Sequence, residues 1–293
     1  MQLVLTSPPF PLNEKKKYGN LRGEEYIEWF ASFAPLLART LTPDGSIVVE
    51  IGNAWEPQRP VMSTVVIRAL LKFLEAANLK LCQEFVWYNP ARLPSPVQWV
   101  NVERIRVKDA FSKIWWMSLT DRPKADNRRV LKPYSPSMKR LIETGRYNPG
   151  PRPSEHNIGK TSFNKNNAGA IPPNVLNADA AESLGSLLKG TNTRSSEEYQ
   201  TFCRTREIPL HPARMPKEIP EFFIKLLTDE SDLVFDPFGG SNTTGAVAES
   251  LNRRWLSCEA HLPYVTSSLG RFGPSELRVV GNVAVSPPAT AAE

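Results

Sequence analysis

Cysteine and histidine are scarce in this chain of 293 residues, which contains three of each. The cysteines are odd in number and far apart, which argues against a disulfide framework or a cysteine zinc site and for a reducing compartment. The histidines are equally scattered, which favours residues that bind no metal. No apolar run approaches the length of a membrane span, and the first residues lack the basic-then-apolar pattern of a secretory signal. We therefore expect a cytoplasmic protein without a metal site.

Positive charge is concentrated in one part of the chain. Residues 101–165 contain 15 Lys or Arg and 6 Asp or Glu, whereas the rest of the chain contains 21 and 24. Aromatic residues are interleaved with this basic stretch, at Trp115, Trp116, Tyr134 and Tyr147. Such a stretch suits a polyanion, above all nucleic acid, although a solvated charged surface would explain the charge equally well.

Strands and helices alternate on both sides of an irregular middle region. The hydrophobic content of 41% is enough for a real core, in one large domain or two modest ones. Residues 121–205 are rich in Pro, Gly, Asn and Ser, with little periodicity, as in functional loops or disordered stretches. The βαβ rhythm predicts an α/β fold with a mostly parallel sheet covered by helices. The expected elements span residues 2–5, 23–41, 46–52, 61–79, 80–89, 217–228, 232–236, 243–251 and 254–260.

The first motif is LTSPPF, residues 5–10. Two prolines restrict the backbone directly after an apolar strand, so the strand ends in a rigid turn. This turn carries the hydroxyl group of Ser7 and the ring of Phe10. Ser-Pro-Pro is also a common loop turn, so the motif alone is weak evidence of function.

The second motif is DLVFDPFGGSNTTGAVAES, residues 232–250. Its strand ends at Asp236, and the Gly239-Gly240 turn lets a ligand approach the backbone before a helix begins. Glu259 ends the next strand, where an acidic side chain can hydrogen-bond ribose hydroxyl groups. The turn differs from the G-x-G-x-x-G of dinucleotide-binding domains. The motif nevertheless favours a nucleotide-like ligand over an empty turn.

Together the two motifs resemble those of the DNA amino-methyltransferases, which transfer a methyl group from S-adenosylmethionine to an exocyclic amine. Their order resembles the permuted beta class, in which the catalytic motif comes first. The resemblance extends along most of residues 3–272 to the PvuII-type cytosine-N4 methyltransferases of restriction–modification systems. The further segments that carry it are SPPFPLNEKKKYGN, WYNPARLPSPVQWVN, RIRVKDAFSKIWW, NNAGAIPPN, HPARMP and EFFIKLLTD.

The resemblance implies a permuted S-adenosylmethionine-dependent methyltransferase fold, a twisted and mostly parallel sheet with helices on both faces. It divides the chain into a catalytic half at 1–120, an inserted target-recognition region at 121–205, a cofactor-binding half at 206–273 and a tail at 274–293. Double-stranded DNA is the implied partner, in the prokaryotic cytoplasm. We expect a monomer that acts independently of any cognate restriction endonuclease. If the middle region carries the specificity of the family, the recognised site is CAGCTG and the inner cytosine is the target.

The resemblance assigns the catalytic role to the first motif. The amine of cytosine is a poor nucleophile, and Ser7 Oγ and the Pro8 carbonyl would accept its two hydrogen bonds. Pro9 would stiffen the turn, and Phe10 would stack on the cytosine after it leaves the duplex. Glu50, where the family usually has Asp, would bind Ser7 and take up the released proton. A surface carboxylate at a strand end is the alternative for Glu50. No metal and no covalent intermediate is required.

The resemblance also implies the remaining binding residues. His211 and Pro212 would line the methionine end of the cofactor, and Phe238 would pack against cofactor or target; for each, a helix-entry loop or a core side chain is the alternative. The other expected cofactor contacts are Asp236, Gly239, Gly240, Ser241, Asn242, Thr243 and Glu259. The basic residues expected to contact DNA are Arg128, Arg129 and Lys132.

Two other functions fit parts of the pattern. Adenine-N6 methylation poses the same chemical problem, although Asp-Pro-Pro-Tyr is the usual motif for adenine and Ser-Pro-Pro-Phe the usual motif for cytosine. A DNA-binding relative without turnover is the second alternative, and the intact Ser7, Asp236 and Glu259 argue against it.

One family element has no match before the first motif, because only MQLVL precedes Thr6. The family places a strand with a Gly-acidic turn there, which helps to hold the cofactor adenine. The segment 275–285 reads as an apolar strand with Gly281-Asn282, and we expect it to supply the missing strand through pairing of residues 277–281. A truncated N-terminus with a frayed tail is the alternative.

Overall fold

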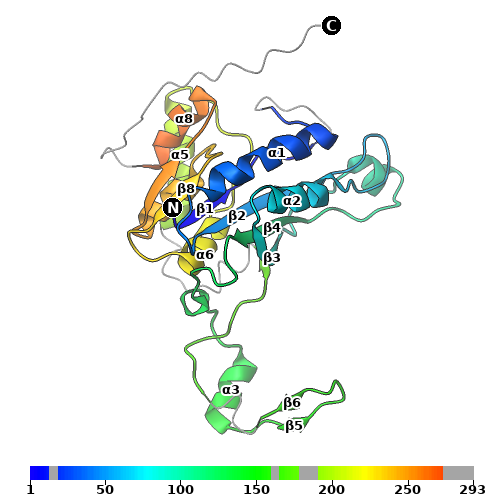
Figure 1. Ribbon diagram of the computed structural model, residues 1–293, viewed down its shortest axis with the longest axis vertical. Coiled ribbons are helices and arrows are strands. Elements are labelled where there is room, and N and C mark those ends of the chain that lie inside the picture. Colours follow the sequence, from blue (N-terminus) through cyan, green and yellow to red (C-terminus); the bar gives the residue numbers. More distant parts are fainter. Residues whose placement is uncertain (13–18, 160–164, 178–190, 273–293) are drawn as a thin grey trace.

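The protein was studied as a computed structural model, which describes residues 1–12, 19–159, 165–177 and 191–272, with side chains from 198 onward in the last range. Within these residues, seven strands form one sheet in the order β7-β3-β4-β2-β1-β8-β9 (Figure 1). Every neighbouring pair is parallel except the two pairs that β4 makes. The strands are β1 (Leu3–Thr6), β2 (Ser46–Gly52), β3 (Lys80–Tyr88), β4 (Phe111–Ser118), β7 (Val175–Asn177), β8 (Leu233–Asp236) and β9 (Arg254–Ser257). The predicted, mostly parallel α/β sheet is therefore confirmed.

Helices cover both faces of the sheet, because alternate residues of each buried strand point to opposite sides. In β1, Val4 packs in the core that includes α1 and α2, whereas Leu3 and Leu5 pack in the core that includes α6 and α7. The helices are α1 (Gly23–Ala38), α2 (Val65–Ala76), α3 (Pro136–Thr144), α5 (Thr191–Thr205), α6 (Glu218–Leu227), α7 (Thr243–Ser250) and α8 (Leu262–Ser268).

The antiparallel strand β4 is the main element that the sequence patterns did not indicate. It pairs with β2 and β3 along its whole length, so it fills the centre of one half of the sheet. Trp115 is 1% exposed in this strand, and Trp116 Nε1 donates a hydrogen bond to Ser46 Oγ at 2.9 Å. The expected polyanion contact is wrong for the buried Trp115, whereas Trp116 is partly buried against the core.

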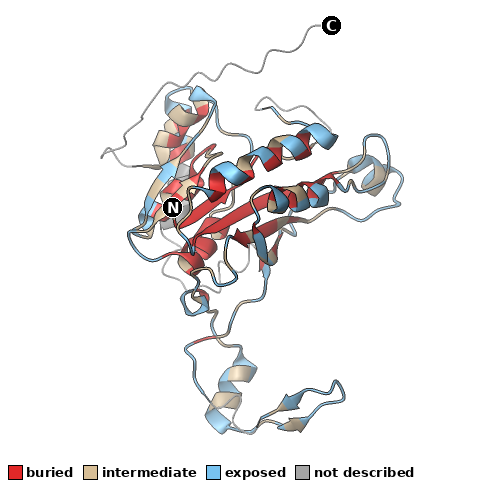
Figure 2. Cartoon of the chain, in the orientation of Figure 1, coloured by how far each residue is buried: buried red, intermediate tan, exposed pale blue. Residues whose placement is uncertain are grey.

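The middle region contains a part that projects from the body (Figure 1). It holds α3 and the two-stranded sheet of β5 (Gly150–Pro151) and β6 (Asn157–Ile158), and we call residues 131–170 the projecting lobe. A bridge between Lys132 and Ala170 closes its base. Figure 2 shows its described residues as exposed or intermediate, apart from the buried Gly169 at its base, so it has little core of its own. By contrast, β7 pairs with β3 in the main sheet, and α5 packs against α8 and the short helix at Leu269–Arg271.

Two further predictions concern membrane-spanning segments and the C-terminal tail. Among the described residues, no helix combines the length and apolar character that crossing a bilayer requires. The expected tail strand at 275–285, with its pairing at 277–281, lies outside the described residues.

Candidate active site

The predicted catalytic and cofactor residues meet at one edge of the sheet. Strands β2, β1, β8 and β9 are parallel neighbours, so their carboxyl ends lie side by side. Glu50 lies near the end of β2, Ser7 directly follows β1, and Asp236 ends β8. The carboxyl edge of a parallel sheet is where α/β proteins bind ligands. Residues far apart in the chain therefore share one site.

Ser7 and Glu50 are in direct contact. Ser7 Oγ donates a hydrogen bond to Glu50 Oε2 at 2.6 Å, a short distance of the kind that hydroxyl–carboxylate pairs make. Glu50 can make this contact because it lies in β2, the strand that pairs with β1. It is only 7% exposed. The hydroxyl hydrogen of Ser7 thus points at the carboxylate, which leaves the oxygen lone pairs to accept other hydrogen bonds.

Packing against the body of the protein holds the turn after Ser7 in place. Pro8 is buried, and Pro9 and Phe10 are partly buried. The ring of Phe10 rests on Gly52 at the end of β2, where an added Cβ would lie 2.7 Å from the ring. Only glycine leaves room for the ring at this strand end. Phe10 therefore sits at the site edge on a rigid support.

Asp236 is a buried junction between three elements. Its Oδ1 accepts hydrogen bonds from Thr6 Oγ1 at 2.7 Å and from the backbone N–H of Phe238 at 3.1 Å. Its Oδ2 accepts one from Thr244 Oγ1 at 2.7 Å. Burial raises the pKa of Asp236 from 3.8 to about 6, against the opposing effect of these three bonds. At 4% exposure, its carboxylate positions the site by holding β1 and α7 together. The expected contact between Asp236 and cofactor stays a prediction.

The glycine turn follows Asp236 and lies close to β9. An added Cβ at Gly239 would lie 1.9 Å from Ser257 Oγ, and Gly240 has a φ of +52°, so both positions favour glycine. Asn242 caps α7: its side chain accepts a hydrogen bond from the N–H of Gly245 at 3.1 Å. The turn thus presents backbone rather than side chains at this edge.

Glu259 and His211 flank this turn. Glu259 Oε2 accepts a hydrogen bond from the N–H of Gly240 at 2.9 Å, and its Oε1 accepts one from the N–H of His261 at 2.8 Å. An added Cβ at Gly240 would lie 3.0 Å from His211 Nε2, so the imidazole borders the turn. Burial lowers the pKa of His211 below its usual value, which favours the neutral ring. Pro212 follows His211 in the same loop.

Arg271 is a site residue that the sequence patterns did not indicate. Its guanidinium donates to the carbonyl of Ser241 at 2.5 Å and to Ser241 Oγ at 3.1 Å, and Ser241 Oγ lies 3.3 Å from Thr243 Oγ1. The guanidinium also lies over the ring of Tyr199, 4.6 Å from its centre. Burial lowers the pKa of Arg271 to about 10. An arginine from beyond α8 therefore holds the start of α7.

Phe238 has a clear structural partner. Its ring lies 5.7 Å from that of Trp29 and 5.1 Å from that of Phe33, both on α1. This aromatic cluster links the glycine turn to α1, the helix that covers β1 and β2. A contact between Phe238 and cofactor or target stays a prediction.

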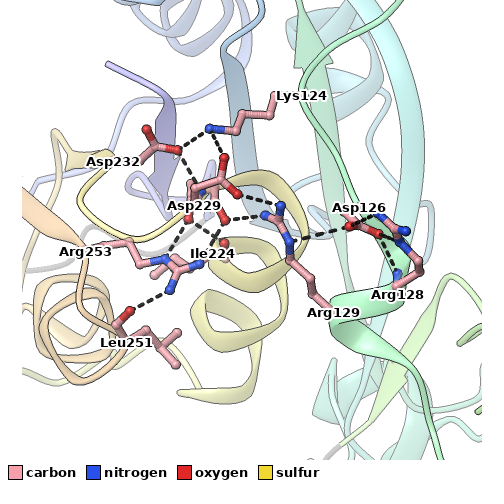
Figure 3. Close-up of polar contacts among 10 residues, drawn as sticks. Lys124, Asp126, Arg128, Arg129, Ile224, Asp229, Asp232, Leu251 and Arg253 are labelled. Carbon is pink, nitrogen blue, oxygen red and sulfur yellow. Dashed lines mark hydrogen bonds and ion pairs between the residues drawn. The ribbon is translucent and has the colours of Figure 1, made fainter. Parts of the chain in front are cut away.

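The expected DNA-binding residues differ in their surroundings (Figure 3). Arg129 is engaged by neighbouring groups at the surface: its guanidinium donates to the carbonyl of Thr228 at 2.6 Å and pairs with Asp229 at 2.5 Å. The side chain of Arg128 is 83% exposed, although it bonds Asp126 at 2.7 Å and holds the pKa of that carboxyl at about 2. The backbone of Lys132 makes the bridge at the base of the projecting lobe.

Comparison with known proteins agrees with this geometry. The family model described as DNA methylase matches residues 1–269. Type II methyltransferase M.PvuII from Proteus hauseri is 47% identical over 274 residues, which cover 93% of this chain and 78% of that protein. Type II methyltransferase M.BglII from Bacillus subtilis is 24% identical, over 90% of this chain and 61% of its own length.

Solved structures give the same picture. The PvuII DNA methyltransferase, described as cytosine-N4-specific, superposes with a TM-score of 0.69 and 39% identity, over 95% of this chain and 81% of its own. A DNA modification methylase from Thermus thermophilus, complexed with S-adenosyl-L-methionine, has a TM-score of 0.51 at 15% identity, over 92% and 84%, and supports the fold alone. Because the family match covers nearly its whole length, this chain belongs to the DNA methylase family.

Proposed function

We propose that this protein is a site-specific DNA methyltransferase that transfers a methyl group from S-adenosylmethionine to the N4 amine of a flipped-out cytosine. The observation that carries the proposal is the Ser7–Glu50 hydrogen bond at the edge where the glycine turn also lies. M.PvuII is 47% identical to this chain, and the PvuII methyltransferase structure that superposes on this chain is described as cytosine-N4-specific. The protein would therefore protect DNA at one sequence in a restriction–modification system.

The residues at the edge fit the cofactor. The Gly239-Gly240 turn presents backbone, and the carboxylate of Glu259 is partly exposed beside it. A carboxylate has about four acceptor positions, and two N–H groups occupy part of them, so Glu259 retains capacity for ribose hydroxyl groups. When bound, S-adenosylmethionine supplies a methyl group attached to a positively charged sulfur. His211, Pro212 and Ser241 to Thr243 would line the rest of its site.

Ser7 and the Pro8 carbonyl would orient the amine of cytosine. The lone pair of this amine is delocalised into the ring, so it is a weak nucleophile until two acceptors hold its hydrogens. Because the hydroxyl hydrogen of Ser7 points at Glu50, the lone pairs of Oγ are available for that purpose. On methylation the nitrogen must lose a proton, and Ser7 Oγ can pass it to Glu50. The rate gain comes mainly from orientation of the reactants, while Phe10 stacks on the extruded base.

The reaction product tests the proposal. Plasmid DNA methylated by the purified protein with S-adenosylmethionine should yield N4-methylcytosine on nucleoside mass analysis. N6-methyladenine would show that the enzyme acts on adenine instead. A protein that binds cofactor and DNA yet gives neither product would be the inactive relative.

The projecting lobe is our candidate for base recognition. It is basic, mostly exposed and joined to the body at a narrow base, so its Arg, Lys and Asn side chains can reach base edges in the major groove. The recognition site CAGCTG, a monomeric state and an independently acting endonuclease stay predictions. Sequencing of the methylated positions, size-exclusion chromatography and neighbouring genes would test them in turn.

The structure separates two arginines that the charge pattern treats alike. Arg128→Ala should reduce the salt dependence of DNA binding, with the slope smaller by about one if it contacts one phosphate. Arg129→Ala should instead lower the free energy of unfolding by about 1 kcal/mol, because Asp229 and the Thr228 carbonyl lose one charged donor while Lys124 and Arg253 still donate to them. Salt-dependent binding titrations and urea unfolding of both variants measure this. An Arg129 variant of unchanged stability but with a reduced salt slope would reverse the assignment.

A further inference from the structure

A long loop between β3 and β4, residues 89–110, begins and ends at the catalytic edge. Gly52 of β2 and Trp87 of β3 both pair with Ser112 of β4, so the three strands are aligned at this point. The loop is fastened there: Asn53 Nδ2 donates a hydrogen bond to Asp109 Oδ1 at 2.8 Å. Figure 1 shows the loop, with its short helix, extending beyond the ends of β2 and β4. It therefore stands beside the strand end that carries Glu50.

The loop is held in one shape by its own cations. Lys108 Nζ donates to the carbonyls of Pro90 at 2.6 Å and Arg92 at 3.2 Å, and Arg92 donates to the carbonyl of Phe111 at 2.9 Å. The short π-helix at Gln98–Val102 forms its far part. These bonds cross from one arm of the loop to the other. The loop can therefore present side chains at defined positions.

The apolar side chains that it presents are unusually exposed. Leu93 is 83% exposed and Val107 is 87% exposed, the two highest values among the large apolar residues that the structure describes. Val97 and Val102 are 59% and 64% exposed in the same loop. Single exposed apolar residues are common, but several on one ordered loop mark a contact surface.

Positive charge lies next to these side chains. Arg104 and Arg106 line an open hollow of about 460 Å³ together with Val100 and Asn101. Within the described part of the chain, no hydrogen bond or ion pair engages the side chain of Arg104. The guanidinium of Arg106 donates to the carbonyls of Pro60 at 3.0 Å and Ile105 at 2.7 Å. Cations beside exposed apolar tips suit a ligand with both phosphates and stackable rings. Duplex DNA has this chemistry, and the proposed reaction brings it to this edge.

We propose that the 89–110 loop is a DNA wedge: Leu93 and Val107 enter the duplex beside the extruded cytosine while Arg104 and Arg106 hold the adjacent phosphates. Apolar wedges of this kind partly unstack base steps. Extrusion leaves an unpaired guanine and a gap, and side chains that occupy the gap oppose return of the base. The inference rests on the proposed function, since it takes duplex DNA as the substrate.

The test compares Leu93→Ala/Val107→Ala with wild type on two duplexes. One duplex is fully paired at the methylated site, and the other has an abasic position opposite the target cytosine. We expect the double variant to lose at least tenfold in kcat/KM on the paired duplex, and to recover most of this loss on the second, where no pair needs to be broken. The matched control is Ile67→Ala/Leu71→Ala, which removes two half-exposed side chains from α2. Equal losses on both duplexes, or no loss, would overturn the proposal.

A readout without turnover separates this inference from the proposed reaction. With 2-aminopurine at the target position, wild type should increase the fluorescence on binding, and the double variant should increase it less at saturating protein. If wild type produces no methylated base but this difference holds, the reaction is wrong and the wedge stands. If the two proteins give the same fluorescence, the wedge is wrong.

Arg104→Asn, which suits the φ of +57° at that position, should reduce the salt slope of binding by about one; an unchanged slope would contradict the phosphate contact.

Discussion

Ser7→Ala is expected to reduce kcat at least 100-fold while S-adenosylmethionine still binds with its original affinity. The substitution removes the oxygen that would hold the amine of cytosine, an interaction that strengthens as the nitrogen attacks. Loss of one such polar contact in an active site costs on the order of 3 kcal/mol of transition-state stabilisation. The glycine turn and Glu259 are untouched, so the cofactor affinity should stay the same. Single-turnover methylation and calorimetric cofactor titration measure the two parts.

The matched control is Ser32→Ala, on the exposed side of α1, where the hydroxyl bonds only the carbonyl of Trp29. This variant should methylate at the wild-type rate. A companion variant, Glu50→Gln, keeps an oxygen that can accept from Ser7 but takes up no proton, so it should lower kcat. A Ser7→Ala enzyme with full activity would show that the hydroxyl group has no role in transfer.

Asp236→Ala is expected to destabilise the protein by on the order of 4 kcal/mol. The substitution leaves the hydroxyl groups of Thr6 and Thr244 and the N–H of Phe238 without their acceptor in a buried place. Asp236→Asn has the same shape, and its amide can donate to Thr244 while its oxygen still accepts from the other two. We therefore expect the Asn variant to fold. The Ala variant should lose both stability and cofactor binding, because the turn that Asp236 holds is no longer fixed. Urea unfolding gives both free energies.

The raised pKa of Asp236 predicts that its contribution to stability falls as pH rises, the reverse of what a carboxyl with a lowered pKa would give. Its pKa is about 6 in the folded protein and 3.8 as the ordinary value, so between these two pH values the folded state holds a proton that the unfolded state has lost. The contribution of Asp236 to stability is therefore fully present below about pH 4, falls as pH rises to about 6, and stays constant above it. The difference in unfolding free energy between wild type and Asp236→Asn should fall by up to about 3 kcal/mol across this window. A difference that rises with pH would mean that the hydrogen bonds outweigh desolvation.

The local chemistry of the site was readable from the sequence. A strand followed by Ser-Pro-Pro-Phe must end in a stiff turn, because proline restricts its own φ and the residue before it. Gly239-Gly240 after a buried strand indicates a tight turn before a helix, and the structure has one there. These features depend on neighbouring residues only. The two motifs together with the further matching segments were enough to predict the family, and the family match confirms it.

Only the tertiary structure decided which side chains support that chemistry. Thr6 and Asp236 are 230 positions apart, and Arg271 reaches Ser241 from beyond the next strand. Nothing in the local pattern indicates such pairs, because they depend on which strands become neighbours in the sheet. The same holds for Arg129, whose charge resembles that of Arg128 in the sequence but is engaged by Asp229, 100 residues later, in the fold. Strand order is set by packing of both sheet faces at once. The sequence by itself therefore determined the motifs and the alternation of strands and helices. The pairing of distant strands decided which side chains hold the site residues in position.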